Sequence, residues 1–227
     1  MISIAIDGPA GAGKSTLARA LAKQFGYIYV DTGALYRAIG IKILDSNIEC
    51  ENSAVESMLD QTSVDLKYID AEQQIFLDGR NVTGYIRSPE ASMMASKCSA
   101  LPSVRTFLLQ KQRMLAEKNS VVMDGRDIGT VVLPKASVKI FLTASAEERA
   151  RRRFNELSQN NTNIMFADVL EDIKKRDYND SHRKIAPLKP ADDAVTVDTS
   201  DLNFEEALNE LKRVIEIKLG EKQLHVL

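Results

Sequence analysis

Residues 2–22, ISIAIDGPAGAGKSTLARALA, constrain the fold of this chain more than any other segment. Five apolar-rich residues lead into a glycine loop and then into a helical pattern, and Gly8, Gly13, Lys14 and Ser15 satisfy the spacing GxxxxGK[ST]. Glycine lets the backbone curl so that successive N–H groups point inward around phosphate oxygens, and the following helix adds its positive end. The spacing therefore predicts a nucleotide-binding loop. The strand before it and the helix after it argue against the alternative, a glycine turn beside an unrelated Lys-Ser pair.

Two side chains of this loop have predicted roles. Lys14 is placed to reach the β- and γ-phosphates of a bound nucleotide, and the Ser15 hydroxyl is placed to ligate Mg²⁺. The loop alone does not say which reaction the nucleotide serves.

Composition adds few constraints. The chain has 227 residues, of which 44% are hydrophobic and 27% charged, with a formal net charge of −2, so bulk charge indicates neither a nucleic-acid nor a membrane partner. Because the first predicted strand begins at Ile2 and no stretch approaches the ~18 apolar residues of a membrane span, we expect neither a signal peptide nor a membrane-spanning helix. We expect a cytoplasmic monomer. Cys50 and Cys98 lack metal-ligand spacing, and we interpret both as buried or incidental thiols.

Strand and helix patterns alternate along most of the chain. Strand-like runs occur at residues 2–6, 27–30, 121–123, 138–143 and 194–197. Helical patterns follow the loop and recur at residues 34–44, 88–99, 103–115, 144–157, 165–180 and 204–219. The helix after residue 103 has the apolar set Val104, Phe107, Leu108, Met114 and Leu115. This alternation predicts an α/β fold with a parallel sheet covered on both faces.

Three segments depart from that alternation. Residues 49–63 are polar with scattered apolar positions, whereas residues 64–86 resemble two or three short strands, which predicts a small sheet-rich insert. Residues 158–163, SQNNTN, read as a polar loop. Arg149, Arg151, Arg152 and Arg153 precede that loop and suggest a mobile, arginine-bearing flap, because arginine pairs two phosphate oxygens at once and stays charged.

Polar side chains follow the ends of two predicted strands besides the one that leads into the loop. Ligands in an open α/β sheet bind outside the carboxyl ends of the strands, so these positions are candidates for chemistry. Each residue taken singly could instead be a helix cap or a surface ion pair. The candidates are Asp31, Thr32, Tyr36 and Arg37 after one strand and Asp124, Arg126 and Asp127 after the other.

A third group lies on the helix predicted to end near residue 180. Arg176, Asp180 and Arg183 are spaced by four and three residues, which places them on one face if the helix continues to Arg183. Two arginines beside an aspartate suit a phosphate and a sugar hydroxyl. The alternative is a solvated helix face with i,i+4 ion pairs.

Two absences narrow the function. The chain has neither the DxxG nor the NKxD element of a switch GTPase, which argues against a regulatory GTPase. Only two histidines are present, His182 and His225, so a histidine general base has few candidates. A phosphate acceptor needs none, because a phosphomonoester with a second pKa near ~6 is already largely dianionic at neutral pH. Such a reaction needs fixed positive charges around two anions together with Mg²⁺, which matches the arginine inventory.

The sequence closely resembles the bacterial cytidylate kinases, a family of nucleoside-monophosphate kinases. The resemblance covers nearly the whole chain and rests on IAIDGPAGAGKST near the N-terminus, DTGALYR at 31–37, DGRDIGTVV at 124–132, KIFLTASAEERARRR at 139–153 and KKRDYNDSHRKIAPL at 174–188. It implies a P-loop three-layer fold with a five-stranded parallel sheet of adenylate-kinase type, ATP as donor, and CMP and dCMP as acceptors. One domain is expected, with a core at 1–45, 88–150 and 178–227, an insert at 63–87 and a lid at 150–175.

The resemblance also implies a role for each site residue. Thr32, Arg37, Arg126 and Arg183 are expected to clamp the acceptor phosphate, and Asp127, Arg105 and Ser96 to read the cytosine edge. Asp180 is expected to bind the ribose hydroxyl and Arg176 to bridge toward the transferred phosphoryl group. Lys14, Arg126, Arg176 and Arg183 are the expected catalytic residues, and Ser15 the expected Mg²⁺ ligand with Asp124 as a second candidate. The expected ATP-binding residues are Gly8, Pro9, Ala10, Gly11, Ala12, Gly13, Lys14, Ser15, Thr16, Arg149 and Arg153, and which of Arg149, Arg151 and Arg153 closes over ATP stays open.

Cytosine selection has a physical reason in this scheme. Asp127 can accept a hydrogen bond from the exocyclic amine of cytosine, whereas uracil would present a carbonyl and leave the carboxylate unpaired. Two other functions remain open: a P-loop kinase for UMP or another small acceptor, and a nucleotide-binding regulator that hydrolyses ATP slowly and acts through a partner. The insert could be part of the acceptor-binding arm or a structural strap.

Overall fold

The computed structural model describes residues 1–69, 72–158 and 164–224. Its internal contacts divide the chain into two compact units. The first consists of Met1–Tyr29 and Asn119–Leu227, and the second of Val30–Lys118.

A five-stranded sheet, four of whose strands belong wholly to the first unit, confirms the predicted parallel α/β architecture. Its order is β2-β6-β1-β7-β8, and β1 pairs in parallel with both β6 and β7, while β7 pairs in parallel with β8. The register Asp7↔Gly125 places the carboxyl ends of β1 and β6 side by side. The strands are β1 (Ser3–Asp7), β2 (Ile28–Asp31), β6 (Val121–Gly125), β7 (Val138–Thr143) and β8 (Val195–Asp198).

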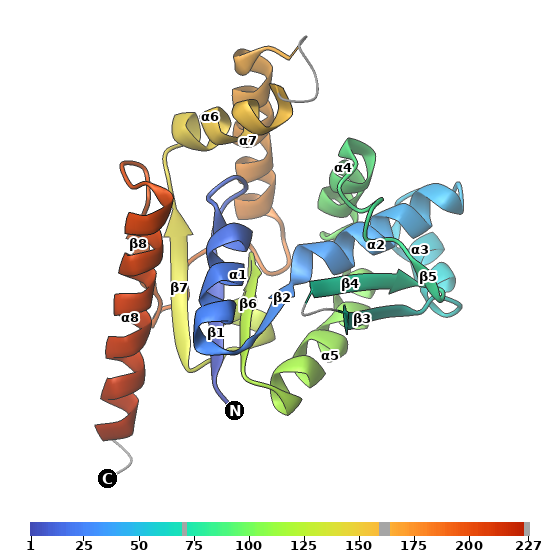
Figure 1. The fold of residues 1–227 in the computed structure, drawn as a ribbon. Helices are drawn as coiled ribbons and strands as arrows, with labels where there is room; N and C mark the ends of the chain where they lie inside the picture. The colour runs from blue at the N-terminus through green and yellow to red at the C-terminus, as the bar shows by residue number, and fades with distance from the viewer. Residues whose placement is uncertain (70–71, 159–163, 225–227) are drawn as a thin grey trace. The chain divides into compact units, whose positions relative to one another are not determined.

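Apolar runs explain why these strands form the centre of the unit. Parallel strands are covered on both faces, and the residues of β1 and β6 are correspondingly almost all buried. Helices α1 (Lys14–Phe25) and α8 (Phe204–Leu224) lie side by side on one face of the sheet (Figure 1). Leu21 of α1 and Leu211 of α8 are fully buried in the core cluster that contains Ile4 of β1.

Helices α6 (Ala146–Ser158) and α7 (Phe166–His182) pack against each other beyond the carboxyl ends of β1 and β7 (Figure 1). Ala150, Val169 and Ile173 form a small apolar cluster between them. Of the polar loop predicted at 158–163, Ser158 is the last residue of α6, and residues 159–163 lie outside the described part of the chain.

The second unit contains the predicted sheet-rich insert. β3, β4 and β5 form an antiparallel sheet in that order, with Val64 opposite Leu77. Its strands are β3 (Val64–Ile69), β4 (Glu72–Leu77) and β5 (Arg80–Asn81). Its helices are α2 (Thr32–Asp45), α3 (Asn52–Leu59), α4 (Pro89–Cys98) and α5 (Pro102–Lys118).

Local sequence signals predicted the start of α4 but did not predict α3. Ser88 caps α4 by accepting a hydrogen bond from Ala91 N at 3.1 Å, with a proline in the first turn, as the sequence predicts. Helix α3 was not predicted, although Val55 and Leu59 lie one turn apart on its buried face.

The prediction that Met114 belongs to the apolar face of α5 is wrong. Val104 and Leu108 are buried, but Met114 is 47% exposed, whereas Gln112 is buried. The buried stripe repeats every four residues from Val104, and Met114 lies half a turn away from it.

Both cysteines of the second unit are free and buried, as expected. Burial raises the pKa of Cys98 to about 12 and also raises that of Cys50, so both are protonated thiols at neutral pH.

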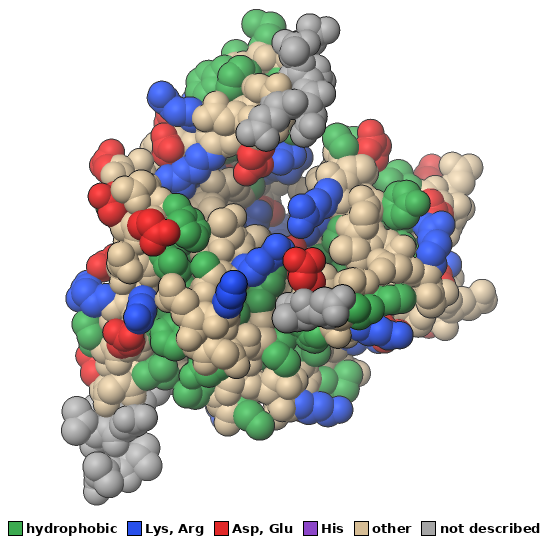
Figure 2. Space-filling view, viewed as in Figure 1, with side chains coloured by type: hydrophobic (Ala, Val, Ile, Leu, Met, Phe, Trp, Pro, Cys, Tyr) green, Lys and Arg blue, Asp and Glu red, His purple; other side chains and the backbone are tan. Residues whose placement is uncertain are grey.

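Acidic and basic side chains are interspersed over the face shown in Figure 2, in keeping with the small net charge. Within the described residues, none of the helices combines the length and the apolar character needed to cross a bilayer.

Candidate active site

The loop between β1 and α1 has the backbone that its glycines predict. Gly11 and Gly13 have φ of +76° and +82°, and no side chain caps the start of α1, so its first N–H groups are left for an anion. Gly8 has φ of +152°, and a Cβ there would lie only 1.9 Å from Leu142 O of β7. Glycine is therefore required at this position by close contact with the neighbouring strand.

Lys14 is buried within the loop, where Nζ donates to Pro9 O at 2.7 Å. Burial and, to a lesser extent, the positive charge of Arg126 together lower the pKa of Lys14 to about 7, against the opposing effects of Asp124 and Asp7. A phosphate group beside Nζ would favour the charged ammonium. Without a bound anion, Lys14 therefore carries less than a full positive charge near neutral pH.

Ser15 and Asp124 form the oxygen pair from which a metal site could be built. Ser15 Oγ donates to Asp124 Oδ2 at 2.8 Å, and Asp124 is buried at the end of β6. A hydroxyl and a carboxylate are the hard ligands that Mg²⁺ prefers, and Mg²⁺ commonly takes one or two protein ligands together with phosphate and water. In the described part of the chain, three or more His, Cys, Asp or Glu side chains do not cluster as a metal site. This donor set therefore fits a Mg²⁺ ion that arrives with nucleotide phosphates.

The sequence analysis missed Asp7, the last residue of β1. Its carboxylate accepts hydrogen bonds from Ile128 N and Gly129 N, both at 2.7 Å, and it is 4% exposed. Burial raises the pKa of Asp7 to about 6, against the effect of the two N–H donors. Asp7 thereby fixes the start of the π-helix η1 (Ile128–Val132), which directly follows Asp127. A charged residue at the end of the apolar run IAI was the available signal.

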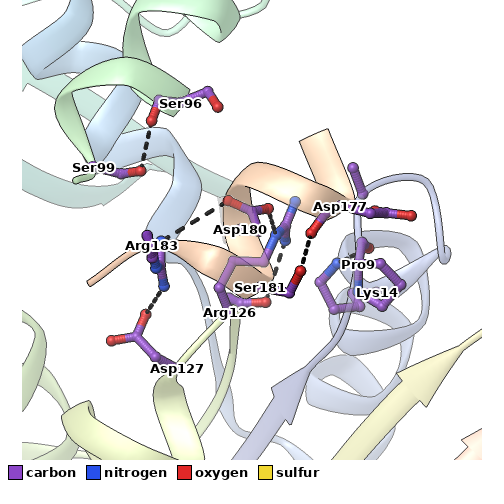
Figure 3. A network of polar contacts seen from close by, with 12 residues as sticks. Pro9, Lys14, Ser96, Ser99, Arg126, Asp127, Asp177, Asp180, Ser181 and Arg183 are labelled. Carbon is purple, nitrogen blue, oxygen red and sulfur yellow. Dashed lines mark hydrogen bonds and ion pairs between the residues drawn. The ribbon is translucent and has the colours of Figure 1, made fainter. Parts of the chain in front are cut away.

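Four predicted acceptor-site residues meet in the first unit (Figure 3). Arg126 Nε donates to Asp180 Oδ2 at 2.9 Å, and Arg183 Nη2 donates to Asp127 Oδ1 at 3.3 Å. Arg183 Nη1 also lies 4.0 Å from Asp180 Oδ1. The side chains of Asp127 and Arg183 are each only 7% exposed. Two guanidinium groups and two carboxylates thus alternate in one cluster, and an incoming phosphate would compete with the carboxylates for the arginines.

The helical face proposed for Arg176, Asp180 and Arg183 does not extend to Arg183. Helix α7 ends at His182, and Arg183 has the extended angles φ −63° and ψ 142°. Arg183 Nε donates to Ala186 O at 2.6 Å in the turn that follows, so the break in the helix directs the guanidinium toward Asp127. Arg176 Nε pairs instead with Asp172 at 2.9 Å, which is the i,i+4 alternative that the sequence left open.

The arginines of α6 have different environments. Arg149 is buried, whereas Arg153 is 43% exposed and pairs with Glu156 at 3.0 Å, and Arg151 is 68% exposed. Arg152, which the sequence analysis did not assign to a site, donates to Thr199 O at 2.7 Å, and its Nη1 would lie 3.9 Å from a Cβ at Gly13. Arg152 therefore lies beside the phosphate loop.

In the second unit, Asp31 organises the start of α2. Its carboxylate caps the helix by accepting from Ala34 N at 2.9 Å and pairs with Arg37 Nη2 at 2.8 Å. Arg37 Nε is a buried donor with no hydrogen-bond partner among the described residues, a property suited to an anion ligand. Thr32 is buried in the first turn of the same helix.

Gln73 of β4 is a second residue that the sequence analysis missed. Its Oε1 accepts from Asp31 N at 2.8 Å and its Nε2 donates to Asp31 O at 3.3 Å. The side-chain amide thus pairs with the backbone just before Thr32 and ties the insert to the start of α2. The sequence offers no local signal for this contact.

The remaining predicted residues of the second unit are Ser96 and Arg105. Arg105 is buried, its Nη1 donates to Ser99 O at 3.2 Å, and its guanidinium lies 6.0 Å from the centre of the Tyr36 ring. Ser99 Oγ donates to Ser96 O at 2.9 Å (Figure 3). Arg105 and Ser96 are thus connected through Ser99.

Comparison with known proteins identifies the family. The family model described as cytidylate kinase matches residues 4–217. A cytidylate kinase of Caldicellulosiruptor bescii is 51% identical over 211 residues, covering 92% of this chain and 93% of the relative. A cytidylate kinase of Carboxydothermus hydrogenoformans is 49% identical over 213 residues, covering 93% and 96%.

Among solved structures, an uncharacterized protein from Eubacterium ventriosum has a TM-score of 0.52 at 14% identity, covering 95% of this chain and 99% of that one. That likeness concerns the fold alone. The family model covers most of the chain, and the two relatives are about half identical to it over most of both lengths. The chain therefore belongs to the cytidylate kinase family.

Proposed function

We propose that this protein transfers the γ-phosphoryl group of ATP to the 5′-phosphate of CMP or dCMP, giving ADP and the nucleoside diphosphate. Family membership supports the substrate class. The observation that carries the mechanism is the proximity of two cationic sites in the first unit. Ser15, next to Lys14, donates to Asp124 at 2.8 Å, and Arg126, two residues after Asp124, pairs with Asp180 at 2.9 Å. A donor loop and an acceptor cluster therefore adjoin.

The transfer itself asks the protein for charge and alignment rather than a base. An oxygen of the dianionic acceptor phosphate attacks the γ-phosphorus, and the bond from that phosphorus to the β,γ-bridging oxygen breaks as ADP leaves. Lys14 holds the donor phosphates, and Arg126 and Arg183 hold the acceptor phosphate, so both anions are neutralised before they meet. Ser15 and Asp124 would hold Mg²⁺, which when bound neutralises charge on the donor phosphates.

The acceptor is bound by groups that currently pair with one another or with the backbone. We assign Thr32 and Arg37 to the acceptor phosphate, Asp180 to the ribose, and Asp127 with Arg105 and Ser96 to the cytosine edge. The side chain of Asp172 is 57% exposed, and an ion pair so open to water is weak. Arg176 would therefore leave Asp172 to reach the transferred phosphoryl group. The loop residues 8–16 and Arg153 are assigned to ATP. The expected single domain, cytoplasmic location and monomeric state stay predictions.

An assay of ADP formation with several nucleoside monophosphates tests this function. CMP and dCMP should be turned over faster than UMP or AMP, and equal or faster turnover of UMP or AMP would refute the specificity. In Asp127→Ala the loss should be concentrated on CMP relative to UMP, because the variant removes the acceptor for the cytosine amine. A uniform loss on both substrates would assign Asp127 a structural role instead.

A further inference from the structure

Arg149 makes an unusual set of contacts for a residue expected to bind ATP. Its side chain is only 6% exposed, and every nitrogen of its guanidinium group donates to a protein oxygen. Nε donates to Ala144 O at 2.8 Å, and Nη1 donates to Ala10 O at 3.1 Å. Nη1 and Nη2 also form a two-pronged pair with the Asp177 carboxylate, at 3.0 and 2.7 Å.

These contacts join three segments of the first unit. Ala10 belongs to the phosphate loop, Arg149 to α6 and Asp177 to α7. The loop packs directly on the two helices, because a Cβ at Gly11 would lie 3.2 Å from Arg149 Cβ and 3.5 Å from Ile173 Cδ1. The planar guanidinium holds the carbonyl and the carboxylate at fixed directions, which a lysine could not do.

Asp177 lies on α7 beside the residues assigned to the reaction. It directly follows Arg176 and precedes Asp180 by three residues, and Asp180 pairs with Arg126 at 2.9 Å. The contact with Arg149 fixes Asp177 relative to the loop, and it therefore also sets the distance between the donor phosphates and the acceptor groups of α7. Misplacement of about 1 Å at a reacting centre can lower the rate about 10²-fold.

We propose that Arg149 and Asp177 are positioning residues that hold the phosphate loop in register with the acceptor groups of α7. Arg149 acts through Ala10 and Asp177 and does not itself contact ATP, because it donates to two backbone carbonyls, those of Ala144 and Ala10, as well as to a carboxylate, whereas Arg126 and Arg183 each donate to one backbone carbonyl. This inference rests on the proposed phosphoryl transfer and replaces the expectation that Arg149 binds ATP directly.

The test compares Arg149→Gln, Asp177→Asn and the double variant with a matched control pair. Glu147 and Lys174 also link α6 to α7, at 3.7 Å, but both are 58% exposed, and their ion pair joins side chains of the two helices alone. For each variant, kcat with ATP and CMP is measured, together with the separate equilibrium affinities for ATP and for CMP.

If the inference is correct, each single variant lowers kcat by about 10- to 100-fold while both affinities change by less than about 3-fold. The double variant is no slower than the slower single variant, because both changes remove the same connection. The control variants Glu147→Gln and Lys174→Gln keep the wild-type kcat. Weaker ATP binding in Arg149→Gln alone, multiplying losses in the double variant, or an equal loss in the controls would each overturn the proposal.

A second measurement does not depend on the acceptor. In the ATP-bound protein, amide hydrogen exchange at residues 8–16 should be faster in Asp177→Asn than in wild type and unchanged in Lys174→Gln. Equal exchange in the Asp177→Asn variant and wild type would contradict the positioning role even if the wild type did not phosphorylate CMP. Absence of CMP turnover in the wild type would refute the proposed function alone. Asp177→Asn also keeps the test decisive if Arg149→Gln does not fold.

Discussion

Replacing Asp7 by asparagine tests how a buried carboxylate supports the acceptor side of the site. Asp7 offers one oxygen to Ile128 N and the other to Gly129 N, both at 2.7 Å. Asparagine has one acceptor oxygen, and its NH₂ group would face the second backbone N–H. The variant therefore loses one hydrogen bond to a charged group, which costs about 1.5–3 kcal/mol. It no longer buries a charge, and the desolvation penalty that it avoids offsets part of that cost.

The sharper expectation is the pH dependence of this difference. The pKa of Asp7 is raised from 3.8 to about 6 in the folded protein, so the fold favours the protonated carboxyl. Its contribution to the free energy of unfolding is fully present below about pH 4 and is lost as the pH rises through about 6. With these two pKa values, linkage predicts that the free energy of unfolding contributed by Asp7 increases by about 2 kcal/mol as the pH falls from about 7 to about 4.5. The stability of wild type relative to Asp7→Asn should therefore increase by about 2 kcal/mol as the pH falls over this range.

Urea unfolding of both proteins at several pH values across this range measures the effect. Asparagine does not titrate, so the other ionisable groups contribute a background common to both curves. If the two stability curves run parallel within about 0.5 kcal/mol, Asp7 titrates as an ordinary carboxyl and the argument from its burial is wrong.

Three further predictions concern the loop and the insert. Gly8→Ala should destabilise the protein by several kcal/mol more than Gly26→Ala in thermal melts, because a Cβ at Gly8 would lie 1.9 Å from the β7 backbone while Gly26 faces open space; equal losses would show that backbone conformation alone matters. ATP binding at about pH 8 should take up protons, because the pKa of Lys14 is lowered to about 7 in the free protein and phosphate raises it; calorimetry in buffers of different ionisation enthalpy measures this, and Lys14→Met should abolish the uptake. Gln73→Ala should raise the KM for CMP with little change in kcat, because it removes both hydrogen bonds to the Asp31 backbone before the acceptor clamp, and a KM equal to wild type would make the insert a structural strap alone.

Most of the fold could be predicted from the sequence, because its signals are local. The glycine spacing of residues 8–15, the apolar runs of the five parallel strands and the Ser88–Pro89 helix start each depend on neighbouring residues. The errors occurred where local patterns are weak or misleading. Helix α3 is short and mostly polar, and Met114 fits an apolar pattern although it lies off the buried face of α5.

The sequence by itself thus determined the chemistry of the loop, since curled N–H groups, a lysine and a hydroxyl within eight residues bind phosphate whatever surrounds them. Only the tertiary structure decided how the other charged residues pair. Arg149 contacts Asp177, 28 residues away in the sequence. The residues that form the Asp31–Gln73 and Arg183–Asp127 contacts are 42 and 56 residues apart. These contacts depend on how helices and strands pack against one another and on where the helices end, which side-chain packing sets over a whole unit.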